Sequence, residues 1–324
     1  MVMRVIEDMK TELLLTVTER RDVADGIVEL ALRAPTGGRL PSWTPGAHID
    51  LVLGDQLTRQ YSLCGDPSDE WTWRIAVLRE AEGRGGSRYV HEHLTVGSTV
   101  ASLGPRNHFE LRSGSDFIFI AGGIGITPIL PMIAATEKSG HTWELHYGGR
   151  CSESMAFVDR VQQLGSGNVT VYTESENGRI DLDSALGTVR PGTQIYCCGP
   201  SPLLDAVQQR AVEWPAGSLV VERFAADPSN AAGADGPGFE VVFEQSGTTA
   251  VVPPGRSIVE VAEEHGISVI TSCEEGVCGT CETTVLEGEV DHRDSVLSAE
   301  ERGSGSSMLI CVSRCNSGRL VLDL

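Results

Sequence analysis

Three cysteines fall within nine consecutive positions of this 324-residue chain, and their spacing constrains its fold more than any other feature. Cys273, Cys278 and Cys281 follow the pattern C-x4-C-x2-C, with Gly276 and Gly279 between them. Cysteines gathered this closely are usually metal ligands, and neither zinc nor iron chemistry is complete with three. The glycines allow the backbone to bend so that its N–H groups can point at sulfur. The sequence therefore predicts a tight ligand loop that needs a fourth thiolate.

Cys311 is the natural fourth ligand, with 29 residues between it and Cys281. The arrangement C-x4-C-x2-C…C is the plant-type [2Fe–2S] spacing, in which a loop wraps the cluster and one distant thiolate clamps it. The alternative is a four-cysteine zinc site built from two close pairs. Cys278 and Cys281 would form one pair and Cys311 and Cys315 the other, which leaves Cys273 unused. On the cluster interpretation, Cys315 is a structural thiol.

The sequence around the loop predicts a small α+β domain over residues 238–324. FEVVFEQ and TTAVVP alternate about a turn, as in a hairpin, and SIVEVAEEHG predicts a helix with a capping box at Ser257 and Glu260. The short apolar run SVIT is then expected to be a strand that leads into the loop. With its cysteine spacing and glycines, this segment resembles a plant-type ferredoxin domain, which implies a β-grasp fold with the cluster at one edge.

The chain is strongly acidic, with a formal net charge of −20. Residues 238–324 hold 15 acidic and 5 basic side chains, a net of −10 and thus half of that charge. Nucleic acid and anionic membranes are therefore poor partners, and the charge serves either solubility or the docking of a partner protein. No apolar run is long enough to span a membrane, and the N-terminal residues lack the order of a signal peptide. A cytoplasmic protein is expected, with its cysteines reduced.

Upstream of the cysteine loop, the pattern of the chain changes near residue 115. Short strand-like runs separated by turn residues come first and predict an antiparallel β-barrel. Strands then alternate with helical stretches, which predicts an α/β domain with a parallel sheet. The tract ADPSNAAGADGPG, from 226 to 238, reads as a linker. We predict a multidomain chain divided into residues 1–113, 114–226, a linker at 227–237, and 238–324.

A ferredoxin passes one electron at a time, whereas a nicotinamide delivers a hydride, so a flavin is expected between them. The stretch RQYSL resembles the R-x-Y-S/T motif of the ferredoxin-reductase superfamily, although such a stretch alone can be any strand end. The resemblance implies that Arg59 contacts the flavin phosphate, that Tyr61 packs by the isoalloxazine, and that Ser62 lies near its reactive N5. The resemblance also implies that Gln60, between Arg59 and Tyr61, binds the cofactor.

A second glycine-rich stretch, GRGGS, follows a strand and precedes a helical segment. Such a turn presents free N–H groups to a phosphate, although a flexible hairpin loop has the same composition. Together with RQYSL some twenty residues earlier, it resembles the flavin-phosphate site of the same superfamily. The resemblance implies phosphate contacts from Gly85, Gly86 and Ser87, and a ring lined by Ala76, Val77 and Leu78.

The second predicted domain holds two motifs of a nicotinamide lobe. AGGIGITP departs from G-x-G-x-x-G, so the strict dinucleotide fingerprint is absent. It nevertheless resembles the superfamily's pyrophosphate turn, and YCCGPSPLL resembles its C-G-P motif beside the nicotinamide; Cys197 is expected to be only a buried strand end. ERFAAD resembles the closing segment that covers the flavin. The residues implied are Gly122, Gly123, Gly125 and Thr127, which reaches the flavin, then Cys198, Gly199, Pro200 and Phe224.

In this order, the three parts resemble the phthalate dioxygenase reductase family over essentially the full length. The resemblance implies FMN, NADH and a [2Fe–2S] cluster, with Ser62, Cys198 and Phe224 as catalytic residues. It further implies that a hydride passes to FMN and that single electrons pass to the cluster through the Ser272–Cys273 edge. A Rieske-type oxygenase for aromatic hydroxylation or O-/N-demethylation is then expected to dock nearby. Arg150 is the only base after its strand, so NADH is favoured over NADPH.

Two other functions fit parts of the same sequence. One is the same electron chain serving a cytochrome P450 or a diiron oxygenase, because only the partner differs. The other is a non-enzymatic binding protein stabilised by zinc, with a degenerate flavin lobe. A monomer is expected for the reductase, as for an electron shuttle.

Overall fold

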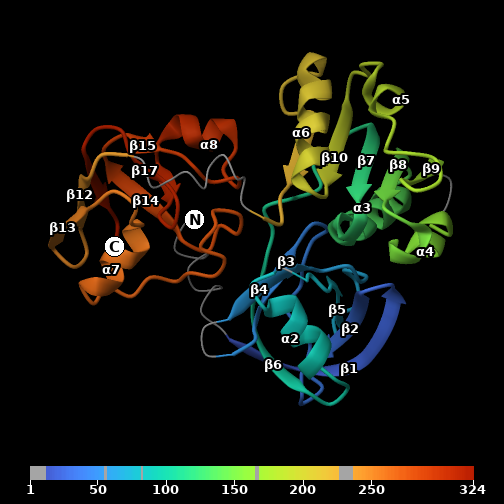
Figure 1. Ribbon diagram of the computed structural model, residues 1–324, viewed down its shortest axis with the longest axis horizontal. Helices are drawn as coiled ribbons and strands as arrows, with labels where there is room; N and C mark the ends of the chain where they lie inside the picture. The colour runs from blue at the N-terminus through green and yellow to red at the C-terminus, as the bar shows by residue number, and fades with distance from the viewer. Residues whose placement is uncertain (1–11, 55–56, 82, 165–167, 226–235) are drawn as a thin grey trace. The chain divides into compact units, whose positions relative to one another are not determined.

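The computed structural model describes residues 12–54, 57–81, 83–164, 168–225 and 236–324. The chain forms two compact units, Met1–Glu222 and Arg223–Leu324 (Figure 1). The first unit contains both an antiparallel and a parallel sheet, whose predicted boundary at 113/114 falls between strands β6 and β7. Most of the predicted linker, residues 226–235, lies outside the described residues, so the predicted domain limits stay predictions.

The first sheet is antiparallel, and its strands follow the order β4-β3-β6-β1-β2-β5. Its members are β1 (Leu13–Ala24), β2 (Ile27–Arg33), β3 (His48–Val52), β4 (Thr58–Ser62), β5 (Trp73–Leu78) and β6 (Thr99–Arg106). A bridge between Leu63, just past β4, and Ile75 of β5 joins the two end strands and closes the sheet. The inward side chains of these strands, such as Leu15, Ile49 and Trp73, form one buried core. The predicted antiparallel barrel is confirmed.

The second sheet of this unit is parallel, in the order β11-β10-β7-β8-β9. Its strands are β7 (Asp116–Gly122), β8 (Thr142–Gly149), β9 (Asn168–Thr173), β10 (Thr193–Cys198) and β11 (Leu219–Glu222). The connecting helices are η1 (Gly123–Gly125), α3 (Ile126–Lys138), η2 (Ser152–Ser154), α4 (Val158–Gln162), α5 (Leu182–Leu186), α6 (Ser201–Arg210) and η3 (Ala211–Glu213). The predicted α/β domain with a parallel sheet is confirmed.

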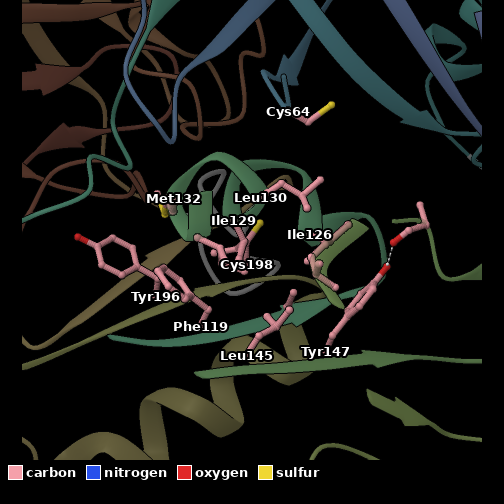
Figure 2. Close-up of a cluster of buried hydrophobic side chains, with 14 of the residues drawn as sticks. Cys64, Phe119, Ile126, Ile129, Leu130, Met132, Leu145, Tyr147, Tyr196 and Cys198 are labelled. Carbon is pink, nitrogen blue, oxygen red and sulfur yellow. Dashed lines mark hydrogen bonds between the residues drawn. The ribbon is translucent and has the colours of Figure 1, made fainter. Parts of the chain in front are cut away.

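Both faces of the parallel sheet are buried, as the continuous apolar run FIFIA requires. Figure 2 shows Ile129 and Leu130 of α3 packed over Phe119 of the sheet. Alternate residues of the same strand, including Ile118, point to the other face, where α6 contributes Leu204. The first of these cores continues into the barrel, because Ile27, Cys64, Ala76 and Phe109 belong to it. The barrel and the parallel sheet are thus packed together in one unit.

The second unit is built on the sheet β13-β12-β18-β14-β16. Its elements are β12 (Phe239–Phe243), β13 (Thr248–Val252), α7 (Ile258–Glu264), β14 (Glu282–Glu287), β15 (Val290–Asp291), α8 (Ala299–Ser304), β16 (Ser307–Leu309), β17 (Arg314–Cys315) and β18 (Arg319–Leu322). Helix α7 packs its buried face onto this sheet, and the predicted capping box between Ser257 and Glu260 is present. The predicted ferredoxin-type domain is confirmed.

One predicted strand in this unit is wrong. SVIT, residues 268–271, forms no strand but runs irregularly from α7 into the cysteine loop. Val269 packs against the core of the unit, so its apolar character reflects burial and not pairing. A short apolar run indicates a buried segment without specifying a ladder partner.

Candidate functional site

The RQYSL motif and the glycine-rich turn meet at the N-terminus of α2 (Gly86–His93). Nη2 of Arg59 donates to the carbonyl of Arg84 at 3.1 Å. A Cβ on Gly86 would lie 2.4 Å from Cγ of Arg59, so only glycine allows this side chain to cross the first turn. Gly85 adopts the left-handed conformation that starts the helix, with φ 86°. Helix N–H groups and a guanidinium together form a site suited to a phosphate.

The other end of α2 is held by residues that the sequence did not single out. Arg20 of β1 donates to the carbonyls of Val90, His91 and Leu94 at 3.0 to 3.3 Å, which caps the helix. Nε2 of His91 lies 2.9 Å from the carbonyl of Val77 in β5. Because the helix is fastened to two barrel strands, its N-terminus stays fixed beside Arg59. Arg20 lies some 70 positions from these carbonyls, so no local pattern announces it.

The remaining predicted flavin residues line the barrel near this helix. Tyr61 packs against the barrel core, and burial raises the pKa of its phenol. Ser62 is buried and pairs in register with His48, and Gln60 pairs with Asp50. The hydroxyl of Ser87 accepts from the N–H of Glu80 at 3.1 Å, which ties the turn to the strand before it.

The three predicted ring-lining residues of β5 do not share one face. Ala76 and Leu78 face the core shared with the parallel sheet, whereas the side chain of Val77 points into the barrel. Only backbone atoms of Val77 are therefore available on the outer face. Successive side chains of a strand point to opposite faces, so three consecutive residues cannot all line one side of a ring.

The two nicotinamide-lobe motifs meet at the carboxyl ends of the neighbouring strands β7 and β10. A Cβ on Gly125 would lie 2.3 Å from the carbonyl oxygen of Cys198, and one on Gly199 would lie 3.0 Å from Cα of Gly122. The backbones of the two motifs thus approach each other so closely that only glycine fits at these positions. The carboxyl edge of a parallel sheet is the usual place for a nucleotide.

Thr127, Gly123 and Pro200 complete this arrangement. Thr127 is buried, and its hydroxyl donates to the carbonyl of Ile124 at 2.9 Å. Gly123 is left-handed, with φ 54°, and Pro200 is the N-cap of α6. Arg150 is exposed at the end of β8, where its carbonyl accepts from Ser175 at 3.2 Å.

Cys198 has a partner that the sequence analysis missed. Its Sγ–H donates to Oε2 of Glu222 at 3.6 Å, across the neighbouring strands β10 and β11. Burial raises the pKa of Cys198, and burial raises the pKa of Glu222 to about 8. A neutral thiol and a protonated carboxyl therefore lie beside the C-G-P motif at neutral pH. Glu222 stands in the quoted segment ERFAAD, but nothing in the sequence indicated that it faces Cys198.

Phe224 is the second residue of the second unit and is 43% exposed. An aromatic ring of this size with so much surface open is available to cover a ligand. In the same unit, Ser272 is half-buried directly before the first cysteine of the loop.

The cysteine loop brings all four predicted ligands together. Cys273, Cys278, Cys281 and Cys311 are 7%, 1%, 3% and 8% exposed. Their thiols form two hydrogen-bonded pairs, Cys273 with Cys278 and Cys281 with Cys311. Within the first pair, the hydrogen bond lowers the pKa of Cys278 to about 5 and raises the pKa of Cys273. Cys315, in β17, pairs with Val290 of β15.

Backbone donors surround these sulfurs. The N–H of Glu275 donates to Cys273 at 3.3 Å, and the N–H of Thr280 donates to Cys278 at 3.4 Å. Left-handed residues at Glu274, Gly276 and Gly279 turn the loop inward. Such N–H groups stabilise the negative charge on a ligating thiolate.

The four thiols fit a two-iron cluster. Each iron of a [2Fe–2S] cluster takes two thiolates, and the chain provides two buried pairs. The arrangement therefore suits the cluster.

Comparisons with known proteins agree with both the cysteine site and the parallel-sheet domain. Residues 241–316 match the 2Fe-2S iron-sulfur cluster binding domain family, and residues 119–209 match the oxidoreductase NAD-binding domain family. The chain is 38% identical to a phthalate 4,5-dioxygenase oxygenase reductase subunit of Pseudomonas putida over 315 residues, which cover 96% of each chain. No helix in the described part of the chain is long and apolar enough to cross a membrane.

Two solved structures extend the comparison. Phthalate dioxygenase reductase, a modular structure for electron transfer from pyridine nucleotides to [2Fe–2S], matches with a TM-score of 0.70 and 35% identity, covering 97% of this chain and 98% of that one. An intact type IV self-sufficient cytochrome P450 monooxygenase matches 97% of this chain with a TM-score of 0.91 and 42% identity. This chain spans only 41% of that longer protein.

Proposed function

Because the chain belongs to the phthalate dioxygenase reductase family of oxygenase reductase components, we propose that it reduces a separate Rieske-type oxygenase with electrons from NADH. As a member of this family it is an oxidoreductase whose cofactors are FMN, NADH and a [2Fe–2S] cluster. Aromatic ring hydroxylation or O-/N-demethylation is the reaction class expected of the oxygenase partner.

The flavin site is proposed at the mouth of the barrel. Arg59 and the first turn of α2 hold the phosphate, and Gly85, Gly86 and Ser87 provide N–H groups to it. Tyr61 is proposed to pack by the ring and Ser62 to lie near its N5, with Ser62 held in place by its strand pairing. When bound, FMN accepts two electrons as a hydride and releases them one at a time.

The nicotinamide is proposed to lie over the meeting point of Gly122, Gly125 and Gly199. The close backbone approach there brings the two glycine motifs together beside Cys198. Cys198 and Glu222 hold a proton at the Sγ and carboxyl atoms, so the site adds no negative charge beside the hydride donor. Phe224 is proposed to cover the flavin until NADH displaces it, and Arg150 to meet the adenosine end.

In the second unit, Cys273, Cys278, Cys281 and Cys311 are the proposed cluster ligands. Their burial excludes water from the sulfurs, and the N–H donors around them favour the thiolate state. Ser272 is proposed to mark the edge through which electrons enter. The acidic surface of the unit is proposed to attract a basic face of the oxygenase.

The observation that carries the choice of partner is the match to a dioxygenase reductase subunit over nearly the whole of both chains. A separate observation favours a second candidate, a cytochrome P450, because the same architecture matches part of a self-sufficient P450. The two candidates differ only in the acceptor, since flavin, nicotinamide and cluster residues serve either.

Coupled turnover distinguishes the candidates. The purified reductase is mixed with NADH and, in separate reactions, with a Rieske oxygenase, a cytochrome P450 or a diiron oxygenase encoded near its gene. Substrate-dependent NADH oxidation with product formation is expected with the Rieske oxygenase. Product formation with only the P450 or only the diiron enzyme would contradict the proposed partner and leave the reductase activity standing.

A further inference from the structure

One short segment connects both cysteine-bearing parts of the second unit. The bridging segment, residues 292–298, follows β15 and precedes α8. The N–H of Ser295 donates to the carbonyl of Gly276 at 2.8 Å, inside the cysteine loop. The N–H of Arg293 donates to Oγ of Ser313 at 3.2 Å, two residues past Cys311. The bridging segment therefore fixes the loop and the distant ligand with respect to each other.

The contact with the loop is close. Gly276 has φ 69°, and a Cβ there would lie 2.6 Å from Cγ2 of Val312 and 3.1 Å from Cα of Asp294. The loop, the bridging segment and the residue after Cys311 are thus packed without space for one methyl group. A displacement of the bridging segment must move at least one of the other two.

Asp294 determines the shape of the bridging segment. Its Oδ2 accepts from the N–H groups of Val296 and Leu297 at 3.0 and 2.8 Å, and its side chain has no exposed surface. Arg302 of α8 donates to the carbonyl of Asp294 at 2.6 Å and lies 3.5 Å from Oδ2. Oδ1 faces Nδ1 of His292 at 3.6 Å and makes no hydrogen bond. Burying a carboxylate so completely is costly unless it is paired and hydrogen-bonded, as Oδ2 is here.

We propose that Asp294 is a positioning residue for the cluster. Its carboxylate folds the bridging segment so that Ser295 holds the loop at Gly276 and Arg293 holds the chain beyond Cys311. The two thiol pairs then keep the spacing that two irons require, although Asp294 touches no cysteine. This inference rests on the cluster ligands proposed above.

The test uses the full-length protein with both cofactors. Asp294→Ala removes the acceptor of the two N–H groups, whereas Asp294→Asn keeps an oxygen that can accept them and removes the charge. Glu260→Ala is the matched control, because Glu260 accepts from the N–H of Ser257 at 2.7 Å in the capping box of α7, away from the bridging segment. Cluster loss to a chelator and the EPR spectrum of the reduced cluster are measured for each, at urea concentrations that equalise stability.

We expect Asp294→Ala to lose its cluster on the order of tenfold faster than the wild type and to show an altered EPR spectrum. Asp294→Asn and Glu260→Ala should keep the wild-type spectrum and release rate, and NADH should reduce the flavin normally in all variants. An Asp294→Ala protein equal to Glu260→Ala in both readouts would overturn the inference. So would an Asp294→Asn protein as impaired as Asp294→Ala, because charge and not shape would then be responsible.

Two further results keep the test decisive. If Asp294→Ala does not fold, Arg302→Ala removes the donor to the Asp294 carbonyl and should accelerate cluster loss in the same direction; an unchanged rate would contradict the inference. A wild-type protein that binds zinc and shows no cluster spectrum would refute the proposed function itself. A wild-type cluster that Asp294→Ala leaves unchanged refutes only the role of Asp294.

Discussion

Replacing Gly86 with alanine should weaken FMN binding without destabilising the barrel. The new Cβ would lie 2.4 Å from Cγ of Arg59, whereas carbon atoms in contact lie about 3.5–4.0 Å apart. Arg59 must therefore swing away by roughly 1 Å or more, and its guanidinium leaves the first turn of α2. A hydrogen bond to a charged group contributes about 1.5–3 kcal/mol, so the Kd for FMN should rise by about 10- to 100-fold.

Stability should change little or in the opposite direction. Gly86 is the first residue of α2 and its φ is not left-handed, and alanine favours a helix over glycine by up to about 1 kcal/mol. The assay is fluorescence titration of the FMN-free protein, with urea unfolding measured in parallel. Gly38→Ala is the control, because no atom lies closer than 3.9 Å to a Cβ at that position.

A double-mutant cycle tests whether Arg59 carries the effect. In an Arg59→Ala background, Gly86→Ala should change the Kd by no more than about twofold, since the displaced side chain is already absent. An undiminished loss in that background would mean that the methyl group strikes the cofactor directly. A Gly86→Ala protein with wild-type FMN affinity would refute the phosphate site as described.

Three further predictions concern other parts of the chain. Glu222→Gln should flatten the pH dependence of stability, because burial raises the folded pKa of Glu222 to about 8 from an ordinary value near 4.5. The contribution of Glu222 to the free energy of unfolding is complete below pH 4.5 and falls by roughly 1.4 kcal/mol per pH unit up to pH 8. If the free energy of unfolding in urea fell equally with pH in wild type and variant, this would be contradicted. Arg20→Ala removes the cap on α2 and should weaken FMN binding several-fold while the cluster spectrum is kept; unchanged affinity would show that the helix needs no such anchor. Cys278→Ser should abolish one-electron delivery to an acceptor protein while NADH still reduces the flavin, and equal loss of both would invert the proposed order of electron transfer.

The architecture could be read from the sequence because its signals are local. The cysteine spacing, the capping box at Ser257 and the glycine turns each lie within a few residues, and their chemistry leaves few alternatives. The change from strands alone to alternating strands and helices separated the barrel from the parallel sheet in the same way. Relatives of similar length then confirmed the family.

What the sequence could not indicate are contacts between distant residues. Arg20 caps a helix about 70 residues away, and Glu222 meets Cys198 only because β10 and β11 lie adjacent in register. Asp294 reads as one acid among many until its burial beside Gly276 is known. The strand predicted for SVIT was wrong for a different reason, because an apolar pattern indicates burial and does not indicate strand pairing.

In the proposed electron path, electrons from NADH reach the cluster only through FMN. The direct measurement is anaerobic mixing of NADH with the full-length protein, with and without FMN, followed by visible absorbance and by EPR of the reduced cluster. We expect the FMN-free protein to keep an oxidised cluster, and added FMN to restore cluster reduction. Reduction of the cluster at the same rate without FMN would contradict it.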